Sequence, residues 1–130
     1  MTANDMTLDE WRFSARLAWQ DRYVRWFTIA NAALLLLSSS FLLWRLIPEG
    51  ARSGVLTFHY NIYLGIDDVR SWSWIFAIPG GAAAVFLLNT SVSFGVFRND
   101  ALASRALVAL ATAVLVVGGV ASFFLVLINL

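Results

Sequence analysis

Three long apolar stretches constrain the fold of this chain more than any other feature of its sequence. They cover residues 26–47, 72–97 and 106–128, and no charged side chain lies in the middle of any of them. About 20 apolar residues of α-helix are needed to cross the hydrocarbon core of a bilayer. The sequence therefore predicts an all-α membrane protein with three transmembrane helices. The first stretch is too long, and ends in residues too bulky, for a cleaved signal peptide.

The composition excludes several classes of function. Of the 130 residues, 60% are hydrophobic and 13% are charged, whereas about a quarter of an average globular chain is charged. A net charge of +1 is too small for a nucleic-acid binder, and the absence of cysteine excludes thiol catalysis and iron–sulfur clusters. Because no ionisable group lies deep in a span, an ion-coupled pump or transporter is disfavoured, and no cofactor is predicted.

The arginines predict the orientation of the chain in the membrane. Six of them flank the start of the first span or the turn between the second and third: Arg12, Arg16, Arg22, Arg25, Arg98 and Arg105. Of three others, Arg45 lies near the end of the first span, and Arg52 and Arg70 lie between the first and second spans. Since positively charged flanks stay in the cytoplasm, we expect a multi-pass protein of the inner (cytoplasmic) membrane with a cytoplasmic N-terminus. The outer loop, residues 48–71, and the C-terminus would then lie outside.

Residues 1–25 are predicted to form a tail and an amphipathic helix, separate from a three-helix membrane domain over residues 26–130. Thr7 and Glu10 have the spacing of a capping box, so the helix is expected to run from Thr7 to Arg22. Apolar side chains recur along it at helical spacing: Leu8, Trp11, Ala15, and Ala18 or Trp19. Tryptophan and leucine opposite arginine favour a helix at the lipid interface, with docking onto a partner protein as the alternative.

Two asparagines, Asn31 and Asn89, lie inside the first and second spans at similar predicted depth. An amide in the membrane is expected to face another helix, and we predict polar packing that includes a contact between these two. Small residues, among them the run Gly80–Ala84, are predicted to pack between helices of one chain rather than to form a dimer seam. Pro79 is predicted to kink the second span.

The outer loop contains the cluster of polar side chains in the sequence that could form a specific site. From Pro48 onward the pattern becomes extended, and apolar and polar residues alternate over Leu56–Tyr63. Alternation of this kind predicts a strand or hairpin-like segment on the outer surface. The residues in it that are candidates for contacting a partner are His59, Tyr60, Asn61, Tyr63, Gly65, Asp67 and Asp68.

A metal site in this loop would use His59 and Asp67, which are weak candidates. Catalytic zinc usually has three protein ligands, and Asp67 and Asp68 are adjacent in the chain, which makes joint chelation awkward. The favoured interpretation is a histidine hydrogen-bonded across the loop, with Asp67, Asp68 or Ser71 capping the second span. Neither a catalytic residue nor a bound metal is therefore predicted.

The segment Phe58–Asp67, followed later by Pro79, resembles a known signature. It is similar to that of a family of small, uncharacterised three-span integral membrane proteins of candidate-phyla bacteria, which carry His-Tyr-Asn-x-Tyr-x-Gly-x-Asp between their first two spans. Asn89 and Asn129 also look similar to positions of that family. The resemblance covers the three spans but not the N-terminal helix. It implies a bacterial membrane protein and carries no activity with it.

A weaker resemblance is to the module of unknown function found beside killing-factor immunity membrane proteins. That module places His-x-Asn-x-x-Gly-x-x-Asp in an outer loop between two spans. This chain has His59-x-Asn61-x-x-x-Gly65-x-Asp67, which departs from the module's spacing on each side of the glycine. The resemblance implies a role in envelope stress or bacteriocin immunity, with the outer loop as the contact surface.

We therefore expect a small accessory or structural subunit that works by binding, through helix packing and an outer-loop contact surface. Its partners would be the lipid bilayer and either another membrane protein or further copies of itself. The alternative is an envelope immunity or sensor protein that binds a peptide or toxin at the outer loop. A metal-dependent membrane enzyme ranks third because its ligand set is incomplete.

Overall fold

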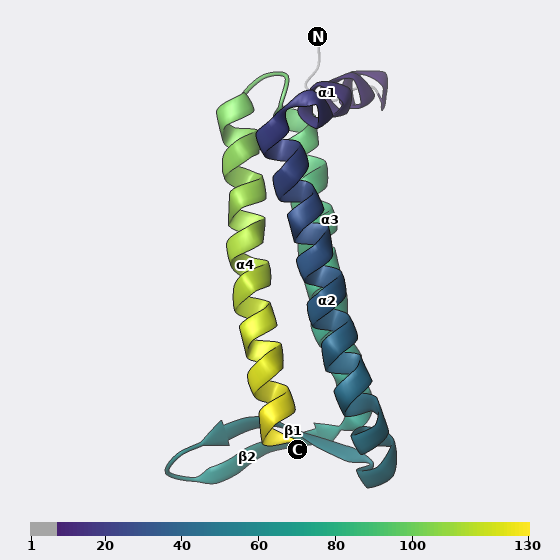
Figure 1. Cartoon of the computed structure of the whole chain (residues 1–130), viewed down its shortest axis with the longest axis vertical. Coiled ribbons are helices and arrows are strands. Elements are labelled where there is room, and N and C mark those ends of the chain that lie inside the picture. Colours follow the sequence, from purple (N-terminus) through teal and green to yellow (C-terminus); the bar gives the residue numbers. More distant parts are fainter. Residues whose placement is uncertain (1–7) are drawn as a thin grey trace, which may run out of the picture. The chain divides into compact units, whose positions relative to one another are not determined.

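The computed structural model describes residues 8–130, apart from the side chains of Tyr60, Asn61 and Asp67. Its elements are α1 (Leu8–Gln20), α2 (Arg22–Ser53), β1 (Val55–Asn61), β2 (Gly65–Ser71), the 3₁₀ helix η1 (Trp72–Phe76), α3 (Ala77–Val96) and α4 (Ala101–Ile128) (Figure 1). In the described part of the chain, three stretches are long and apolar enough to cross a membrane: α2, η1 together with α3, and α4. The prediction of a mostly helical protein with three potential spans is confirmed.

The elements form two compact units. The first contains α1, the start of α2, and the parts of α3 and α4 on either side of their connecting turn (up to Ala33, and Ala84–Val114). The second contains the rest of α2, the β1–β2 hairpin, the start of α3 and the end of α4 (Leu34–Ala83 and Leu115–Leu130). Each long helix thus contributes to both units. The expected division of the chain after residue 25 stays a prediction.

In the first unit, α1 lies against the C-terminal end of α3 (Figure 1). The buried Ser14 Oγ donates to the Phe94 carbonyl at 2.6 Å and accepts from the Arg98 N–H at 3.1 Å. Trp11 Nε1 donates to the Ser91 carbonyl at 3.1 Å. The last four carbonyls of a helix have no partner within it, and Phe94 carries one of them, so Ser14 supplies a donor that the end of α3 lacks.

The packed side of α1 takes in only part of the predicted apolar stripe. Trp11, Ser14 and Ala18 face the unit, and Ser14 and Ala18 are buried. Leu8 and Trp19 are exposed instead, at 76% and 45%. A serine lies at the centre of the packed stripe because its hydroxyl bonds the α3 backbone, and a pattern of hydrophobicity does not record such a bond.

Asp21 separates α1 from α2. Its Oδ1 accepts from the Val24 N–H at 3.0 Å, as in a helix N-cap, and its Oδ2 accepts from Arg105 Nη2 at 2.6 Å. The Arg105 guanidinium and the Val24 N–H together lower the pKa of this carboxyl. The helix that was expected to run to Arg22 therefore ends at Gln20. Thr7, the first residue of the proposed capping box, lies outside the described residues.

Inside the first unit, asparagine side chains from α2 and α3 bind the backbone of α4. Asn31 Nδ2 donates to the Val108 carbonyl at 3.0 Å, and Asn89 Nδ2 donates to the Leu107 carbonyl at 2.9 Å. Thr112 Oγ1 donates to Asn31 Oδ1 at 2.7 Å. The predicted contact between the two asparagines is wrong, because each amide uses the second lone pair of an α4 carbonyl. Such a bond is worth about 0.6–2 kcal/mol in a membrane.

The second unit has an apolar core to which the hairpin contributes. The buried members of this core are Leu42, Leu46, Leu56, Ile75, Leu125 and Val126. They come from α2, β1, η1 and α4, so the strand residue Leu56 joins the hairpin to the helices. Phe41 of α2 and Phe123 of α4 also stack, with ring centroids 6.3 Å apart.

α2 continues through Pro48 to Ser53, although the sequence predicted an extended chain from Pro48 onward. Gly50 accounts for part of the difference, because it is buried against Trp72: a Cβ here would lie 2.6 Å from Trp72 Cβ. Ser53 Oγ also donates to the Glu49 carbonyl at 2.9 Å. Packing and bonding of the last turns therefore outweigh the one backbone bond that the proline removes.

Pro79 lies in the first turn of α3, where an N–H has no partner within the helix, shortly after the 3₁₀ helix η1. The kink predicted there stays a prediction, whereas the expectation for the glycines of this span changes. Gly80 and Gly81 are exposed, and a Cβ on either would meet no described atom within 4 Å. These glycines therefore do not pack between helices of the described chain as expected.

The lowered pKa of Asp21 predicts a specific pH dependence. A carboxyl whose pKa is lower in the folded state adds stability above its unfolded value of about 3.9, and this contribution is lost as the pH falls through the folded value. Asp21→Asn keeps a capping side chain but removes the charge. We expect the wild type in detergent to melt at a higher temperature than Asp21→Asn at neutral pH, followed by circular dichroism. The gap should close below about pH 4; a gap that persists would contradict this account.

Candidate functional site

The β1–β2 hairpin is the candidate site, and its register is irregular at His59. The strands are antiparallel, with Thr57 opposite Val69 and His59 opposite Asp68, and the pairing shifts on both sides of His59. Shifts of this kind bend a strand and redirect its side chains. The strict alternation expected along β1 is therefore wrong at this point, because the neighbours Phe58 and His59 line the same groove.

A side-chain amide holds the base of the hairpin. Asn129 Oδ1 accepts from the Thr57 N–H at 2.7 Å, and Asn129 Nδ2 donates to the Thr57 carbonyl at 2.7 Å. Nδ2 also donates to the Leu125 carbonyl at 2.9 Å, which fixes the amide to α4. The amide thus occupies the outer edge of β1 as a short third strand would. Beside it, Leu56 is buried in the core, with 2% of its surface exposed.

Asn129 was not among the site residues that the sequence indicated. It entered only through a family resemblance, because no pairing partner for an amide after the third span is visible in the sequence. The signal that could have found it is its position directly after the last apolar turn of α4. An amide there has both a donor and an acceptor available for an extended backbone segment.

On β2, Asp68 pairs with Arg70 rather than with a helix N-terminus. Arg70 Nε lies 2.9 Å from Asp68 Oδ1, and its guanidinium lies 5.2 Å from the ring centroid of Trp74. Ser71, the residue before η1, makes no side-chain capping bond. Asp68 and Ser71 therefore do not cap the second span as expected, and the side chain of Asp67 lies outside the described residues.

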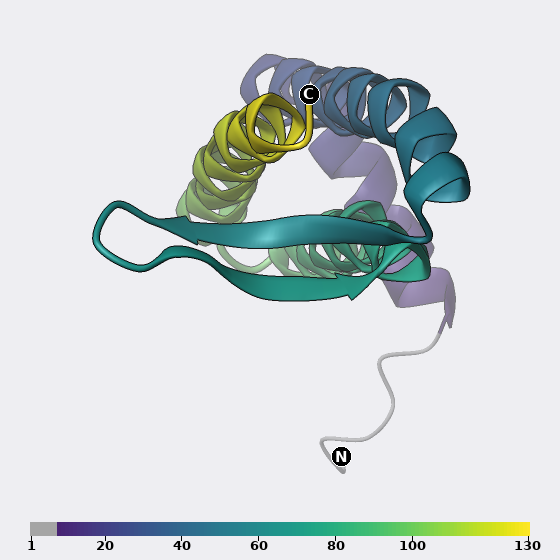
Figure 2. The same cartoon turned by 90° about the horizontal axis from the view of Figure 1, so that it is seen from below.

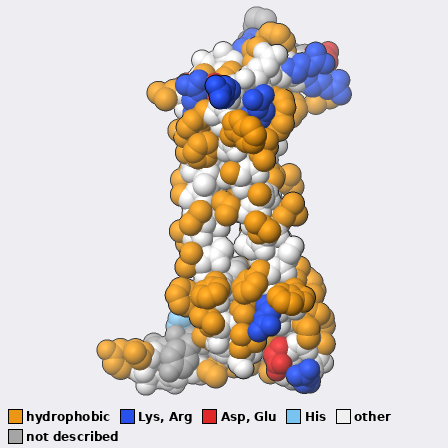
Figure 3. Space-filling view, viewed as in Figure 1, with side chains coloured by type: hydrophobic (Ala, Val, Ile, Leu, Met, Phe, Trp, Pro, Cys, Tyr) orange, Lys and Arg blue, Asp and Glu red, His pale blue; other side chains and the backbone are white. Residues whose placement is uncertain are grey.

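The turn of the hairpin is apolar and exposed. Ile62, Tyr63 and Leu64 have exposed fractions of 80%, 91% and 77%. Gly65 follows with φ of 76°, a left-handed conformation that glycine adopts without strain. The turn extends past the C-terminal part of α4 (Figure 2), and hydrophobic side chains cover it (Figure 3). Exposed apolar side chains grouped in this way are typical of a contact surface.

The remaining sequence candidates lie partly outside the described residues. Nothing is described of the side chains of Tyr60, Asn61 and Asp67, so their roles in contact or metal binding stay predictions. In the described part of the chain, no three His, Cys, Asp or Glu side chains are grouped so that they could hold a metal ion. The structure does place His59 and Asp68 opposite each other on the two strands.

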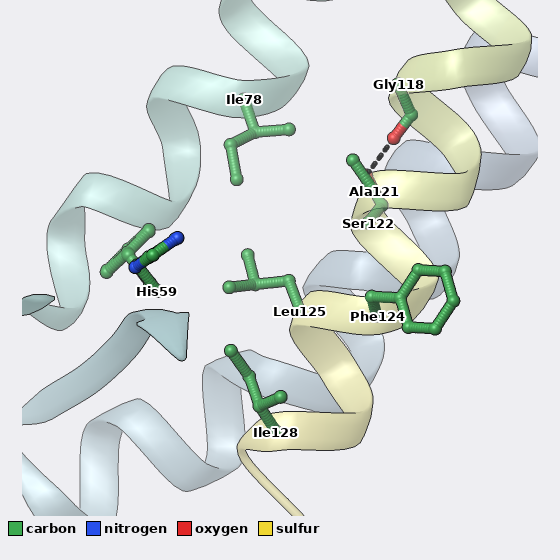
Figure 4. A pocket seen from close by; sticks show the side chains of 9 residues that line it. His59, Ile78, Gly118, Ala121, Ser122, Phe124, Leu125 and Ile128 are labelled. Atoms are coloured by element: carbon green, nitrogen blue, oxygen red, sulfur yellow. Dashed lines mark hydrogen bonds between the residues drawn. The ribbon is translucent and has the colours of Figure 1, made fainter. Parts of the chain in front are cut away.

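An apolar groove of about 530 Å³ lies beside the hairpin, between α3, α4 and β1 (Figure 4). Its lining residues are Phe58, His59, Ile78, Gly118, Ala121, Ser122, Phe124, Leu125 and Ile128. Leu125 of α4 and Ile78 of α3 point into the groove, and His59 of β1 lies at its edge (Figure 4). The sequence did not indicate this groove, because its walls come from three separate segments.

Comparisons of the chain with family models, with curated proteins and with solved structures find no match. In the second unit, side chains with specific bonds lie beside exposed apolar surface at the hairpin, at its support and on the helices that carry it.

Asn129→Leu tests whether the amide holds the hairpin. Leucine is similar in size but leaves the N–H and the carbonyl of Thr57 without this partner, which costs about 1–3 kcal/mol when such groups are buried. We expect hydrogen–deuterium exchange of β1 to become roughly ten- to hundredfold faster, at about 1.4 kcal/mol per tenfold change. Mass spectrometry of peptides from β1 measures this, with Leu130→Ala as the control. Unchanged exchange in Asn129→Leu would show that the amide is dispensable.

Proposed function

We propose that this protein is a small accessory or structural subunit of the bacterial inner membrane that presents the hairpin as a contact surface outside the cytoplasm. One observation carries the proposal: an exposed apolar turn, Ile62–Leu64, extends from a base that is fixed by Asn129 and Leu56. The mechanism is binding. A surface that is already ordered loses little conformational entropy when a partner covers it.

The character of the turn supports a protein partner. Tyr63 is a large, amphipathic side chain of the kind that anchors interfaces, and Ile62 and Leu64 flank it with aliphatic surface. Gly65 fixes the direction in which the chain leaves the turn. A partner could therefore bury several apolar side chains at once. The partner is another membrane protein or a further copy of this chain.

The proposed orientation rests on the arginines and on α1. Arg12 and Arg16 lie on the exposed side of α1, near Leu8 and Trp19, which are also exposed. Basic side chains gather beside hydrophobic ones in the part of the surface that α1 forms (Figure 3). This composition suits a helix at a lipid surface with anionic headgroups, as on the cytoplasmic side. The N-terminus is then cytoplasmic, and the hairpin and the C-terminus lie outside.

The edge of β2 favours a second candidate, an envelope immunity or sensor protein. Among the described residues the sheet has two strands, so β2 has one edge that pairs with no other strand. An extended peptide or toxin segment could add to this edge by backbone hydrogen bonds. Cells that lack this protein would then become sensitive to an envelope-directed peptide. Unchanged sensitivity across a panel of such peptides would argue against this role.

The subunit proposal is tested by placing a photoreactive amino acid at position 63 of the full-length chain. We expect crosslinks in intact membranes to one protein, either a defined partner or a second copy, and recovery of the same complex in mild detergent. Tyr63→Ser combined with Leu64→Ser should lower this recovery at least fivefold, because both apolar anchors are lost.

The matched control is Val69→Ser, because Val69 is an exposed apolar residue of the same hairpin that lies away from the turn. It should leave recovery of the complex unchanged. A wild-type protein that is a monodisperse monomer without crosslinks at position 63 would contradict the proposal. Equal recovery from the turn variant and the control would also contradict it.

A further inference from the structure

The groove beside the hairpin offers a ligand almost no hydrogen bonds. Of its lining side chains, only His59 and Ser122 are polar, and Ser122 Oγ donates to the Gly118 carbonyl at 2.8 Å. A peptide backbone or a sugar would leave its polar groups unpaired against such a wall. Apolar cavities also stay free of ordered water. The chemistry of the lining therefore selects a hydrocarbon occupant.

The dimensions of the groove agree with one hydrocarbon chain. Its lining on α4 runs from Gly118 to Ile128, which is about 15 Å along a helix axis at 1.5 Å per residue. The hydrocarbon core of a bilayer is about 30 Å thick, so this length corresponds to one leaflet. The volume of about 530 Å³ also lies in the range of small-molecule sites, about 300–1,000 Å³.

Gly118 keeps the inner part of the groove open. A Cβ on Gly118 would meet no described atom within 4 Å. Small residues usually let membrane helices approach each other closely. Here Gly118 leaves space instead, and in a membrane-spanning segment acyl chains fill space that opens to the bilayer.

The groove has one polar end. His59 lies on its edge on β1, across the groove from Leu125, whereas Gly118 lies further along α4 (Figure 4). A molecule with a polar head and a long apolar tail matches this arrangement. We propose that the groove binds one acyl chain of a bilayer phospholipid, with the headgroup at His59 and the chain lying along α4 toward Gly118. This site is separate from the turn on which the proposed subunit function rests.

The test is photolabelling of the full-length protein in nanodiscs with a phosphatidylcholine that carries a diazirine in one acyl chain. We expect labels to concentrate on the groove side of α4, with a diazirine near the headgroup labelling Ile128 and one near the chain end labelling Gly118 or Ala121. Gly118→Phe fills the groove and should reduce this labelling at least fivefold. Native mass spectrometry should show one retained phospholipid on the wild type and none on Gly118→Phe.

Val117→Phe is the matched control, because it adds a similar ring on the neighbouring, exposed residue outside the groove. It should label as the wild type does. Equal labelling of the two variants, whether high or low, would overturn the proposal. Even labelling around α4, or a protein segment that protects the groove from lipid, would overturn it as well. A wild-type protein that retains the phospholipid but yields no protein partner at position 63 would count only against the subunit function.

Discussion

A polar side chain inside a bilayer has no water to bind, and the asparagine amides of this chain bind the backbone of neighbouring elements instead. The amides of Asn31 and Asn89 donate to neighbouring carbonyls of α4 in the first unit. In the second unit, Asn129 binds both backbone groups of Thr57. Each of these bonds joins an amide to the backbone of another element. Apolar packing alone selects weakly among possible helix contacts, so the amides determine which surfaces meet.

The same constraint explains why a hairpin can accompany a helical membrane protein. A two-stranded sheet is marginal by itself, and an open strand edge is tolerated only where it is covered or solvated. Leu56 anchors one end of β1 in the apolar core, and the Asn129 amide covers its outer edge. The turn is then free to expose Tyr63 and its neighbours without loss of order at the base. A fixed base and an exposed turn are what a contact surface requires.

The sequence predicted the features that depend on composition. It did not predict helix ends or hydrogen-bond partners that depend on one contact between distant residues. The three spans followed from long apolar runs, since hydropathy is a property of the residues themselves. Pro48 does not end α2, because Gly50 packs under Trp72, a residue that is distant in sequence. Asn31 was correctly expected to face a helix, but the identity of its acceptor depends on how α4 is rotated.

The candidate site shows the same division. The hairpin-like segment was expected from alternation, but the register shifts at His59 put Phe58 and His59 on one groove, and no local pattern encodes such shifts. The roles of Asn129 and of the groove depend on segments that only the fold brings together. Gly118 borders open space, which its sequence neighbours do not reveal.

The proposed function requires the hairpin to lie outside the cytoplasm and the α3–α4 turn to lie inside it, and cysteine labelling tests this topology directly. The chain has no cysteine, so Val69→Cys and Asn99→Cys each introduce one thiol, on β2 away from the contact turn and in the α3–α4 turn. With a membrane-impermeant maleimide on spheroplasts, we expect Val69→Cys to react at once and Asn99→Cys to react only after lysis. Reaction of both thiols before lysis, or of Asn99→Cys alone, would contradict the proposed topology.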